Sequence, residues 1–235
     1  RLAQDLNASF RPTRITVLKS LNIAGPMGIE HIIMCGAQIV STIIVAPLGT
    51  VALAANSFGI IVESLCYMPG YGIADAATTL VGQGIGAGRK VLSRQFANIT
   101  VISGIVIMSL MAVLMYVSAD WVMSLMTPDL GVQHLAAHVL RIEAFAEPMF
   151  AASIVCYGVF VGAGDTITPC WMNLVSMWGV RLTLAYLLIN VFEMGLMGMW
   201  VAMCAELCFR GLIFLLRLWK GNWMKKNLVT VGSSK

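Results

Sequence analysis

The segment LVGQGIGAGRK, residues 80–90, decides how the rest of the chain is interpreted, because its glycine spacing has two structural meanings. Gly82, Gly84, Gly86 and Ala87 match G-x-G-x-x-[GA], the phosphate-binding turn of dinucleotide-binding domains. Such a turn works only between a buried strand and a helix whose N-terminus faces the pyrophosphate. The residues on either side therefore decide between a nucleotide site and another kind of turn.

The composition of the chain favours lipid over water as its surroundings. Of 235 residues, 59% are hydrophobic and 11% are charged. Soluble domains carry about 25% charged residues, so this chain has too few charges to cover a surface exposed to water. Its basic residues form no continuous stripe with interleaved aromatic residues, so no nucleic acid partner is expected.

Six apolar stretches are each long enough to cross about 30 Å of hydrocarbon, which requires about 20 helical residues. They comprise residues 17–46, 51–80, 97–118, 133–161, 169–190 and 195–219. A membrane-spanning helix, and not a strand, therefore precedes the glycines of residues 80–90. We expect an all-α integral membrane protein with one six-helix bundle, preceded by a linker at 1–16 and followed by a tail at 220–235.

Three prolines lie inside stretches that exceed the minimum spanning length. Pro26, Pro69 and Pro148 each lack an amide donor and press against the preceding helical turn. They are the expected kink positions.

Lysine and arginine are distributed unequally between the two sets of loops. One set carries Arg1, Arg11, Arg14 and Lys19 before or at the start of the first stretch, Arg89, Lys90 and Arg94 after the second, and Arg217, Lys220, Lys225 and Lys226 around the end of the last. The opposite loops, 47–50, 119–132 and 191–194, contain neither residue type. Because cytoplasmic loops are enriched in Lys and Arg, both termini are expected in the cytoplasm. There the basic residues would meet the anionic lipid headgroups of the plasma (inner) membrane.

Ionisable residues inside the predicted spans are the first candidates for function, because each costs at least about 2.5 to 3.5 kcal/mol at the bilayer centre unless it is paired, hydrated or used. The ion-coupling candidates are Glu30, Glu63 and Glu147, which can exchange a proton or bind a cation. Glu30 comes first because it follows Gly25-Pro26, where freed backbone carbonyls add polarity. Arg141 can pair with at most one of the three. For each, the alternative is an inert, hydrogen-bonded carboxyl.

A second ionisable group is expected to fasten the bundle. Counting residues along the fifth and sixth stretches places Arg181 and Glu206 near one level, which suggests an interhelical ion pair. Glu206 and Arg210 are also spaced i, i+4 on one helix face. We therefore assign Arg181, Glu206 and Arg210 to a structural ion pair, with a transport role as the alternative.

Catalytic and metal-binding arrangements are not recognisable in the sequence. Cys204 and Cys208 lie four residues apart inside a predicted span, where thiols are expected to pack as small apolar groups. His134 and His138 share a helix face but have no third ligand nearby in sequence. With no catalytic triad either, we expect neither an enzyme nor a bound cofactor or metal, and only a coupling ion, proton or sodium.

Four motifs resemble one family of transporters. They are YMPGYGIADAATTLVGQGIGAGR (67–89), GAGDTITP (162–169), VRLTLAYLL (180–188) and GLMGMWVAMCAELCFRGLIFLLRLWKGNW (195–223). The residues of these motifs and their order along the chain resemble those of the multidrug and toxic compound extrusion (MATE) transporters, and the resemblance covers approximately residues 12–223. RPTRITVLKSLNIAGPMGIE (11–30) looks like the start of the second half of such a protein.

The resemblance implies an antiporter with twelve helices in two six-helix bundles. It would export organic, often cationic compounds and be driven by protons or sodium ions. One bundle then requires another, either a missing N-terminal half or a homodimer partner, and the start at Arg1 is expected to reflect truncation. Two departures leave the coupling ion and its site open. Many members carry Arg where Val161 stands, and some place a cation-binding acid near Met34.

The substrate surface is expected at the cleft between the two bundles. Met and aromatic side chains can repack around flat apolar compounds, which makes Met34, Gln38, Tyr67, Tyr157 and Trp178 the cleft candidates. The alternative is that the 16 methionines are core filler.

Three other functions stay open at this point. A lipid-linked saccharide or lipid flippase would need several cleft cations, for which Arg141 and Arg181 are the only candidates. An intramembrane enzyme would need clustered nucleophile, base or metal ligands. A non-transporting membrane subunit would need neither cleft cations nor such a cluster. The glycines of residues 80–90 are interpreted in each case as a turn between two membrane helices, with no affinity for nucleotides.

Overall fold

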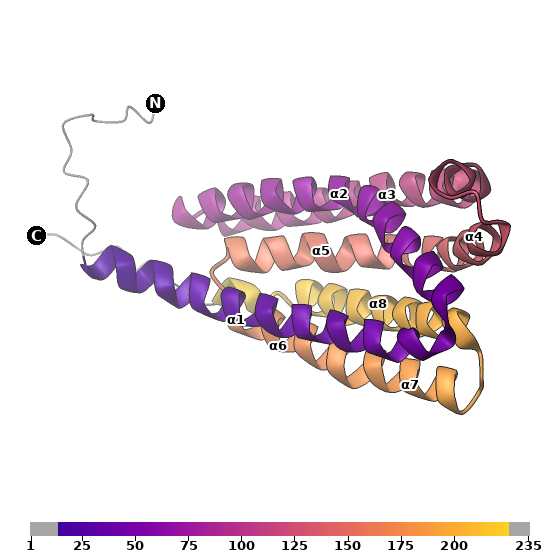
Figure 1. Cartoon of the computed structure of the whole chain (residues 1–235). Coiled ribbons are helices and arrows are strands. Elements are labelled where there is room, and N and C mark those ends of the chain that lie inside the picture. The colour runs from indigo at the N-terminus through magenta and orange to yellow at the C-terminus, as the bar shows by residue number, and fades with distance from the viewer. Residues whose placement is uncertain (1–13, 226–235) are drawn as a thin grey trace, which may run out of the picture.

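The computed structural model describes residues 14–225, which are almost entirely helical. The elements are α1 (Arg14–Val45), η1 (Ala46–Leu48), α2 (Thr50–Gly86), α3 (Lys90–Met126), α4 (Leu130–Ala144), α5 (Glu147–Gly162), α6 (Ile167–Leu174), the π-helical η2 (Val175–Arg181), α7 (Leu182–Asn190), α8 (Gly195–Lys220) and η3 (Asn222–Lys225). Helices α2 and α3 form one layer, α5 lies beneath them, and α6, α7 and α8 form the layer beyond (Figure 1). Helix α1 runs along α6 and α7.

Five helical segments are long and apolar enough to cross a membrane: 24–48, 50–86, 90–126, 167–190 and 195–220. A sixth span arises if α4 and α5, bent by 59° to each other, cross together. The outer surface agrees with lipid contact. On α3 the exposed side chains form an apolar stripe of Ile102, Val106, Leu110, Val113 and Val117. The expected all-α membrane fold is confirmed.

The fourth predicted span, 133–161, was expected as one helix and is two. Helix α4 ends at Ala144 and α5 begins at Glu147. Pro148 lies in the first turn of α5, where its missing amide leaves no hydrogen bond unmade. The bend lies at residues 145–146, just before Pro148, whereas α1 and α2 continue through Pro26 and Pro69.

Several helix ends lie outside the predicted stretches, most clearly around residues 80–90. Helix α2 continues through Gly86, and α3 begins at Lys90 instead of residue 97. Hydropathy marks only the part of a helix that hydrocarbon can surround, whereas polar residues extend it into water. The connection is a tight turn in which Gly88 has φ +72°, a left-handed conformation that glycine adopts without strain. Residues 80–90 therefore form the end of α2, a tight turn and the start of α3, and the expected turn between two membrane helices is confirmed.

The predicted linker and tail also need correction. Helix α1 already begins at Arg14, inside the linker placed at 1–16, because polar residues can continue a helix beyond hydrocarbon. Within the tail placed at 220–235, Trp223 is buried against Phe160, with ring centroids 6.3 Å apart. An aromatic ring that packs on the bundle belongs to the fold. The remaining parts of both segments, 1–13 and 226–235, lie outside the described residues.

Helix α5 is central because glycines let it approach α2 closely. A Cβ at Gly158 would meet the backbone of Ala74, and one at Gly162 would meet the backbone of Thr78. The Thr78 hydroxyl donates to the Gly158 carbonyl at 2.9 Å. Helix α5 also packs on α3 and α8, so side chains on it can reach most of the bundle.

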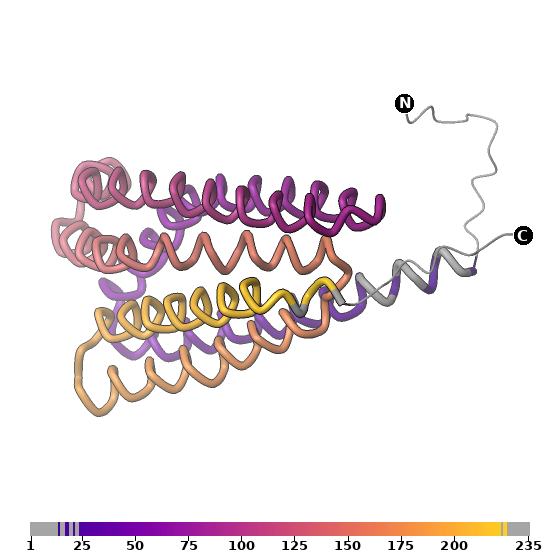
Figure 2. The backbone as a smooth tube through the Cα atoms, turned by 180° about the vertical axis from the view of Figure 1, so that it is seen from behind, coloured from indigo at the N-terminus to yellow at the C-terminus, as the bar shows by residue number. Residues whose placement is uncertain are grey.

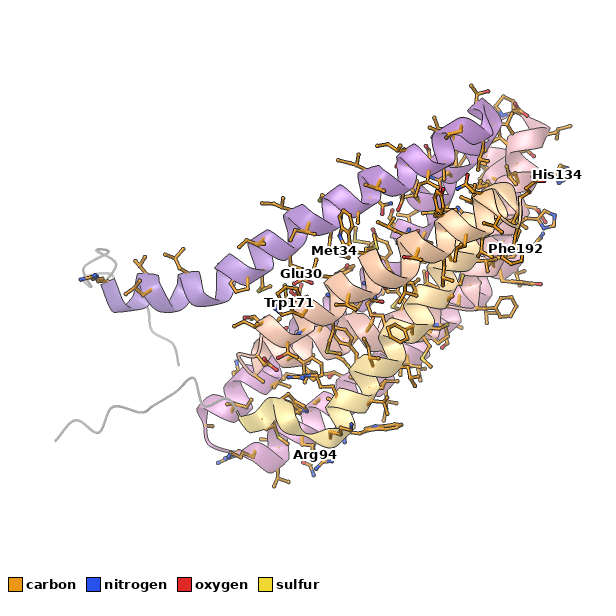
Figure 3. The ribbon with its side chains drawn as sticks, turned by 90° about the horizontal axis from the view of Figure 1, so that it is seen from below. Glu30, Met34, Arg94, His134, Trp171 and Phe192 are labelled. Atoms are coloured by element: carbon orange, nitrogen blue, oxygen red, sulfur yellow. The ribbon has the colours of Figure 1, made fainter. Side chains whose placement is uncertain are left out.

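The bundle has two chemically different ends. Helix α1 begins, and α8 ends, at the same end of the bundle (Figure 2). That end, called here the basic end, also carries Arg89, Lys90 and Arg94. Arg94 lies there, whereas His134 and Phe192 lie at the opposite end (Figure 3). The even number of crossings agrees with six spans.

Candidate functional site: buried acids around helix α5

Buried charged side chains surround helix α5 and identify the candidate site. Those buried between the spans are Glu30, Glu63, Glu143, Glu147, Arg181, Glu206 and Arg210. They come from α1, α2, α4, α5, η2 and α8. All three predicted ion-coupling acids are among them, together with Glu143, which the candidate set omitted.

Glu30 joins three helices through two hydrogen bonds. The Tyr157 hydroxyl of α5 donates to Oε2 at 2.8 Å, and Asn173 Nδ2 of α6 donates to Oε1 at 2.6 Å. Only 5% of Glu30 is exposed. Both carboxyl oxygens therefore have a neutral donor, and α1 is held against α5 and α6 at this level.

The sequence of α1 turns Glu30 toward these partners. Glu30, Ala37 and Ser41 are buried at spacings of seven and four residues, which place them on one face of a helix. Glu30 and Met34 lie on the side of α1 that faces the helix carrying Trp171 (Figure 3). His31, one position on, is exposed, as expected for a residue turned about 100° away.

Glu143 and Glu147 flank the break between α4 and α5 and have few partners. Both are fully buried. Within residues 14–225, neither oxygen of Glu147 has a hydrogen-bond partner, and nor does Oε1 of Glu143. Oε2 of Glu143 accepts a weak hydrogen bond from Cys204 Sγ at 3.3 Å. A buried carboxylate without donors is costly, so these acids need a proton, a cation or water.

The predicted ion pair is formed differently from the expectation. Glu206 Oε1 lies 3.1 Å from Arg210 Nε on the same helix and accepts a hydrogen bond from the Ser176 hydroxyl at 2.6 Å. No ion pair joins Arg181 to Glu206 among the described residues. Equal depth brings two helices together, but it does not fix the direction of a long side chain. The i, i+4 pair is the one that forms.

Arg181 is held largely by sulfur. Its Nη2 lies 2.7 Å from Met203 Sδ, and Nη1 lies 3.7 Å from Met177 Sδ. Thioether sulfur is a weak acceptor, so the guanidinium keeps most of its charge available to the surrounding acids. Glu63, Glu143 and Glu206 are all within electrostatic range of it.

The buried acids around these two arginines outnumber them. Four carboxyls, of Glu63, Glu143, Glu147 and Glu206, share the interior with the guanidiniums of Arg181 and Arg210. Glu63 interacts electrostatically with both arginines, and Glu206 is paired with Arg210. Two guanidiniums can balance two carboxylates, so the other two acids require protons or a bound cation.

The predicted cleft residues fall into two groups. Met34 packs with Ala37, Met177 and Leu182, and Trp178 of η2 lies near Gly36 of α1. Tyr67 lies elsewhere, edge-on to Phe150 at 5.7 Å between ring centroids. Gln38 is half-buried on α1.

Tyr71 connects these groups and was not predicted. Its ring lies 5.5 Å from Tyr67, between centroids, and its hydroxyl is within electrostatic range of Glu30, Glu63 and Arg210. It is 49% exposed. An exposed aromatic residue between two buried acids was recognisable only as part of the PGYG motif.

Asn173 and Arg141 both have partners that the sequence did not predict. Asn173 carries no charge, so a search for ionisable residues passed over it. Arg141 forms an ion pair with Asp120 on α3, and not with any of the three candidate acids. No group of three potential metal ligands occurs among the residues that the structure describes.

Sequence comparison assigns this arrangement to a family. A family model described as MatE matches residues 26–187. The chain belongs to the MatE family. Members of this family are transporters and not enzymes, and a MatE chain with these apolar helices is a multi-pass membrane protein.

Curated relatives of the chain carry the name probable multidrug resistance protein NorM. The protein of Thermotoga maritima is 27% identical over 210 residues, which cover 89% of this MatE chain and 45% of the relative. That of Idiomarina loihiensis is 26% identical over 213 residues, covering 89% and 46%. The chain therefore spans about half the length of these curated relatives.

Solved structures share the MatE fold. The MATE transporter ClbM in complex with Rb+ matches with a TM-score of 0.81 at 22% identity, over 87% of this chain and 47% of ClbM. The Vibrio cholerae MATE transporter VcmN in the bent form matches with a TM-score of 0.81 at 20% identity, over 92% and 48%.

Proposed function

We propose that this chain is one six-helix bundle of a secondary active antiporter, which exports organic, often cationic compounds in exchange for protons or sodium ions. The observation that carries the proposal is the excess of buried carboxyls over guanidiniums inside the bundle. An acid at membrane depth without a fixed counter-charge can take up and release a coupling ion. The names of the NorM relatives support multidrug efflux as the task of the whole protein.

Among the acids, Glu147 is the proposed coupling residue. Both its oxygens lack partners in the described part of the chain, so its charge depends on an ion that comes and goes. Glu63 is buried, and the nearby guanidiniums of Arg181 and Arg210 offset only part of the cost of burying its charge. Glu30, with two donors, links α1 to the core and carries the coupling to that helix.

The proposed assembly contains a second six-helix bundle, as a covalent N-terminal half or a homodimer partner. The proposed substrate surface includes both groups of cleft residues, with Tyr67, Tyr71 and Tyr157 on α2 and α5 and with Met34, Gln38 and Trp178 on α1 and η2. The basic end is placed in the cytoplasm of a plasma-membrane transporter, following the distribution of Lys and Arg.

The state of the arginines supports an antiporter over a lipid-linked saccharide or lipid flippase. A phosphate-binding cleft needs free cations. Arg141 is paired with Asp120, and Arg210 with Glu206. Arg181 is buried among acids.

The test is ethidium efflux from a drug-susceptible host that lacks its own pumps and expresses the full-length transporter containing this chain. Proton and sodium gradients are collapsed separately. Efflux should stop with one of the two, and that ion is the coupling ion. Efflux that persists after both gradients are lost would exclude secondary antiport, and a host that gains no efflux would favour the non-transporting subunit.

A further inference from the structure

A wide-open surface cavity of about 530 Å³ lies between α3, α4 and α8, away from the Glu30 site. Its lining residues come from those helices and from the break after α4: Tyr116, His138, Arg141, Ile142, Phe145, Met197 and Cys204. Met197 lies near the start of α8, and His138 lies one turn from His134, which marks the end opposite the basic end (Figure 3). The cavity therefore belongs to that half of the bundle.

The inner wall of the cavity touches a buried acid. Cys204, a lining residue, contacts Glu143 Oε2 through Sγ at 3.3 Å. Glu143 is fully buried, and its other oxygen has no hydrogen-bond partner within residues 14–225. One thiol therefore separates the cavity from an acid that has this thiol as its one weak donor among the described residues.

The rim of the cavity is polar enough to hold water. Arg141 forms an ion pair with Asp120, whose side chain is 63% exposed. The guanidinium also lies over the ring of Tyr116, 5.8 Å from its centroid. An exposed ion pair and an exposed histidine keep their hydration, whereas hydrocarbon around them would be costly.

We propose that this cavity is a hydrated vestibule through which the coupling proton reaches Glu143, the first carboxyl on its way to Glu147. The proposal rests on the antiport function and names its ion. The lining side chains offer a guanidinium, an imidazole, a thiol and a phenol. The carboxylate at the rim, Asp120, is already paired with Arg141, so among the described residues no lining carboxylate is free to bind a sodium ion. Water and the His138 imidazole can carry a proton.

Groups around Glu143 are suited to passing the proton on. Those within electrostatic range are Glu63, Glu147, Arg181, Cys204 and Cys208. The two other acids compete with Glu143 for negative charge, so a proton that arrives from the vestibule is shared among the three. Glu147, which has no hydrogen-bond partner among residues 14–225, receives it beyond the break between α4 and α5.

Thiol labelling tests the vestibule without depending on transport. Two forms of the full-length transporter keep a single cysteine, Cys204 or Cys208, in proteoliposomes. Cys208 is the matched control because it lies one turn away on α8, is exposed, and does not line the cavity. The membrane-impermeant, cationic reagent 2-(trimethylammonio)ethyl methanethiosulfonate should modify Cys204 faster than Cys208, because water and a charged reagent reach the cavity and the acid beside Cys204 attracts a cation.

Two labelling outcomes would overturn the vestibule. One is labelling of Cys204 no faster than of Cys208. The other is reaction of both only with the lipid-soluble reagent N-ethylmaleimide, which would assign the cavity to lipid chains. Because labelling is read chemically, either result leaves the antiport proposal standing, and a failure of efflux leaves the labelling contrast standing.

A second experiment tests Glu143 itself. Glu143→Gln should reduce gradient-driven ethidium accumulation in proteoliposomes to background while leaving substrate exchange without a gradient intact. A merely structural defect would reduce both. Glu193→Gln, an exposed acid in the α7–α8 connection, serves as the control and should keep both. Parental gradient-driven accumulation in Glu143→Gln would show that Glu143 carries no proton.

Discussion

Glu30 and Glu147 are both buried acids that depend on helix α5, but only Glu30 has hydrogen-bond donors. Glu30 accepts from Tyr157 and Asn173, whereas both oxygens of Glu147 lack partners within the described residues. Both acids lie inside apolar stretches of the sequence, which is why both were predicted to be at membrane depth, and both are buried. The difference lies in the neighbours, and it separates an acid that can hold charge in place from one that needs a mobile ion.

The largest effect is expected from removing the two acids separately. Glu147→Gln should reduce gradient-driven efflux to the level of the empty host, because an amide cannot release a proton or bind a cation. Its thermal midpoint in detergent should be unchanged or higher, since no hydrogen bond is lost. Glu30→Gln should keep measurable efflux but lower the midpoint, because an amide cannot accept both donors equally. Ethidium efflux and thermal unfolding measure the two quantities. Equal loss of efflux in both variants would remove the distinction.

A second change makes Glu206 resemble Glu147. Arg210→Met leaves Glu206 buried with Ser176 as its remaining described partner. Removing one member of a buried ion pair costs about 3 to 5 kcal/mol, whereas replacing both can be neutral. The single variant should therefore unfold at a much lower temperature, and Glu206→Leu combined with Arg210→Met should recover most of the loss. A double variant as unstable as the single one would contradict this interpretation.

A third change acts on both sites at once through α5. Gly158→Ala would place a methyl group against the backbone of Ala74, and overpacking of this kind costs about 1 to 3 kcal/mol. The shift should disturb Tyr157 next to it and weaken efflux as well. Gly72 on α2 is the matched control, because a Cβ there meets nothing within 4 Å. Gly72→Ala should be neutral or stabilising by up to about 1 kcal/mol. Equal thermal midpoints of Gly158→Ala and Gly72→Ala would show that α5 can move away from α2 at no measurable cost.

The smallest effect is expected from one donor. Tyr157→Phe removes the hydroxyl that bonds Glu30, which costs about 1 kcal/mol. In the Glu30→Gln background the same change should cost less, because its partner is altered. Thermal unfolding of the four proteins completes the cycle. Strictly additive losses would mean that the hydroxyl stabilises α5 without Glu30.

The membrane-spanning segments could be predicted from the sequence, but the residues at which the helices begin and end could not. Runs of apolar residues record contact with hydrocarbon, and Pro148 predicts a kink from its missing amide. The continuation of α2 through Gly86 and the start of α3 at Lys90 depend on packing and on water beyond the bilayer, which leave no mark in hydropathy.

The same limit applies to the site. Glu30, Glu63 and Glu147 were recognisable because charge inside an apolar stretch is conspicuous. Asn173 was not, since a neutral amide is common in helices. The pairing of Arg181 was wrong because counting turns gives height along a helix, but not the direction in which a flexible side chain points. Glu143 lay beside Glu147 in sequence, and only the cavity next to Cys204 gives it a distinct role.

The π-helical segment η2 carries a geometric consequence for both sites. Asn173 lies before it, whereas Ser176 and Arg181 lie within it. A π-helix holds more residues per turn than an α-helix, so it resets the angular phase between everything before and after it. Rewinding Val175–Arg181 into an α-helix would rotate Asn173 around the axis relative to Arg181 without breaking the rod. The π-helical turn therefore fixes the direction of Asn173 relative to Arg181. With it, the Asn173 amide can bind Glu30 while the Arg181 guanidinium lies among the inner acids.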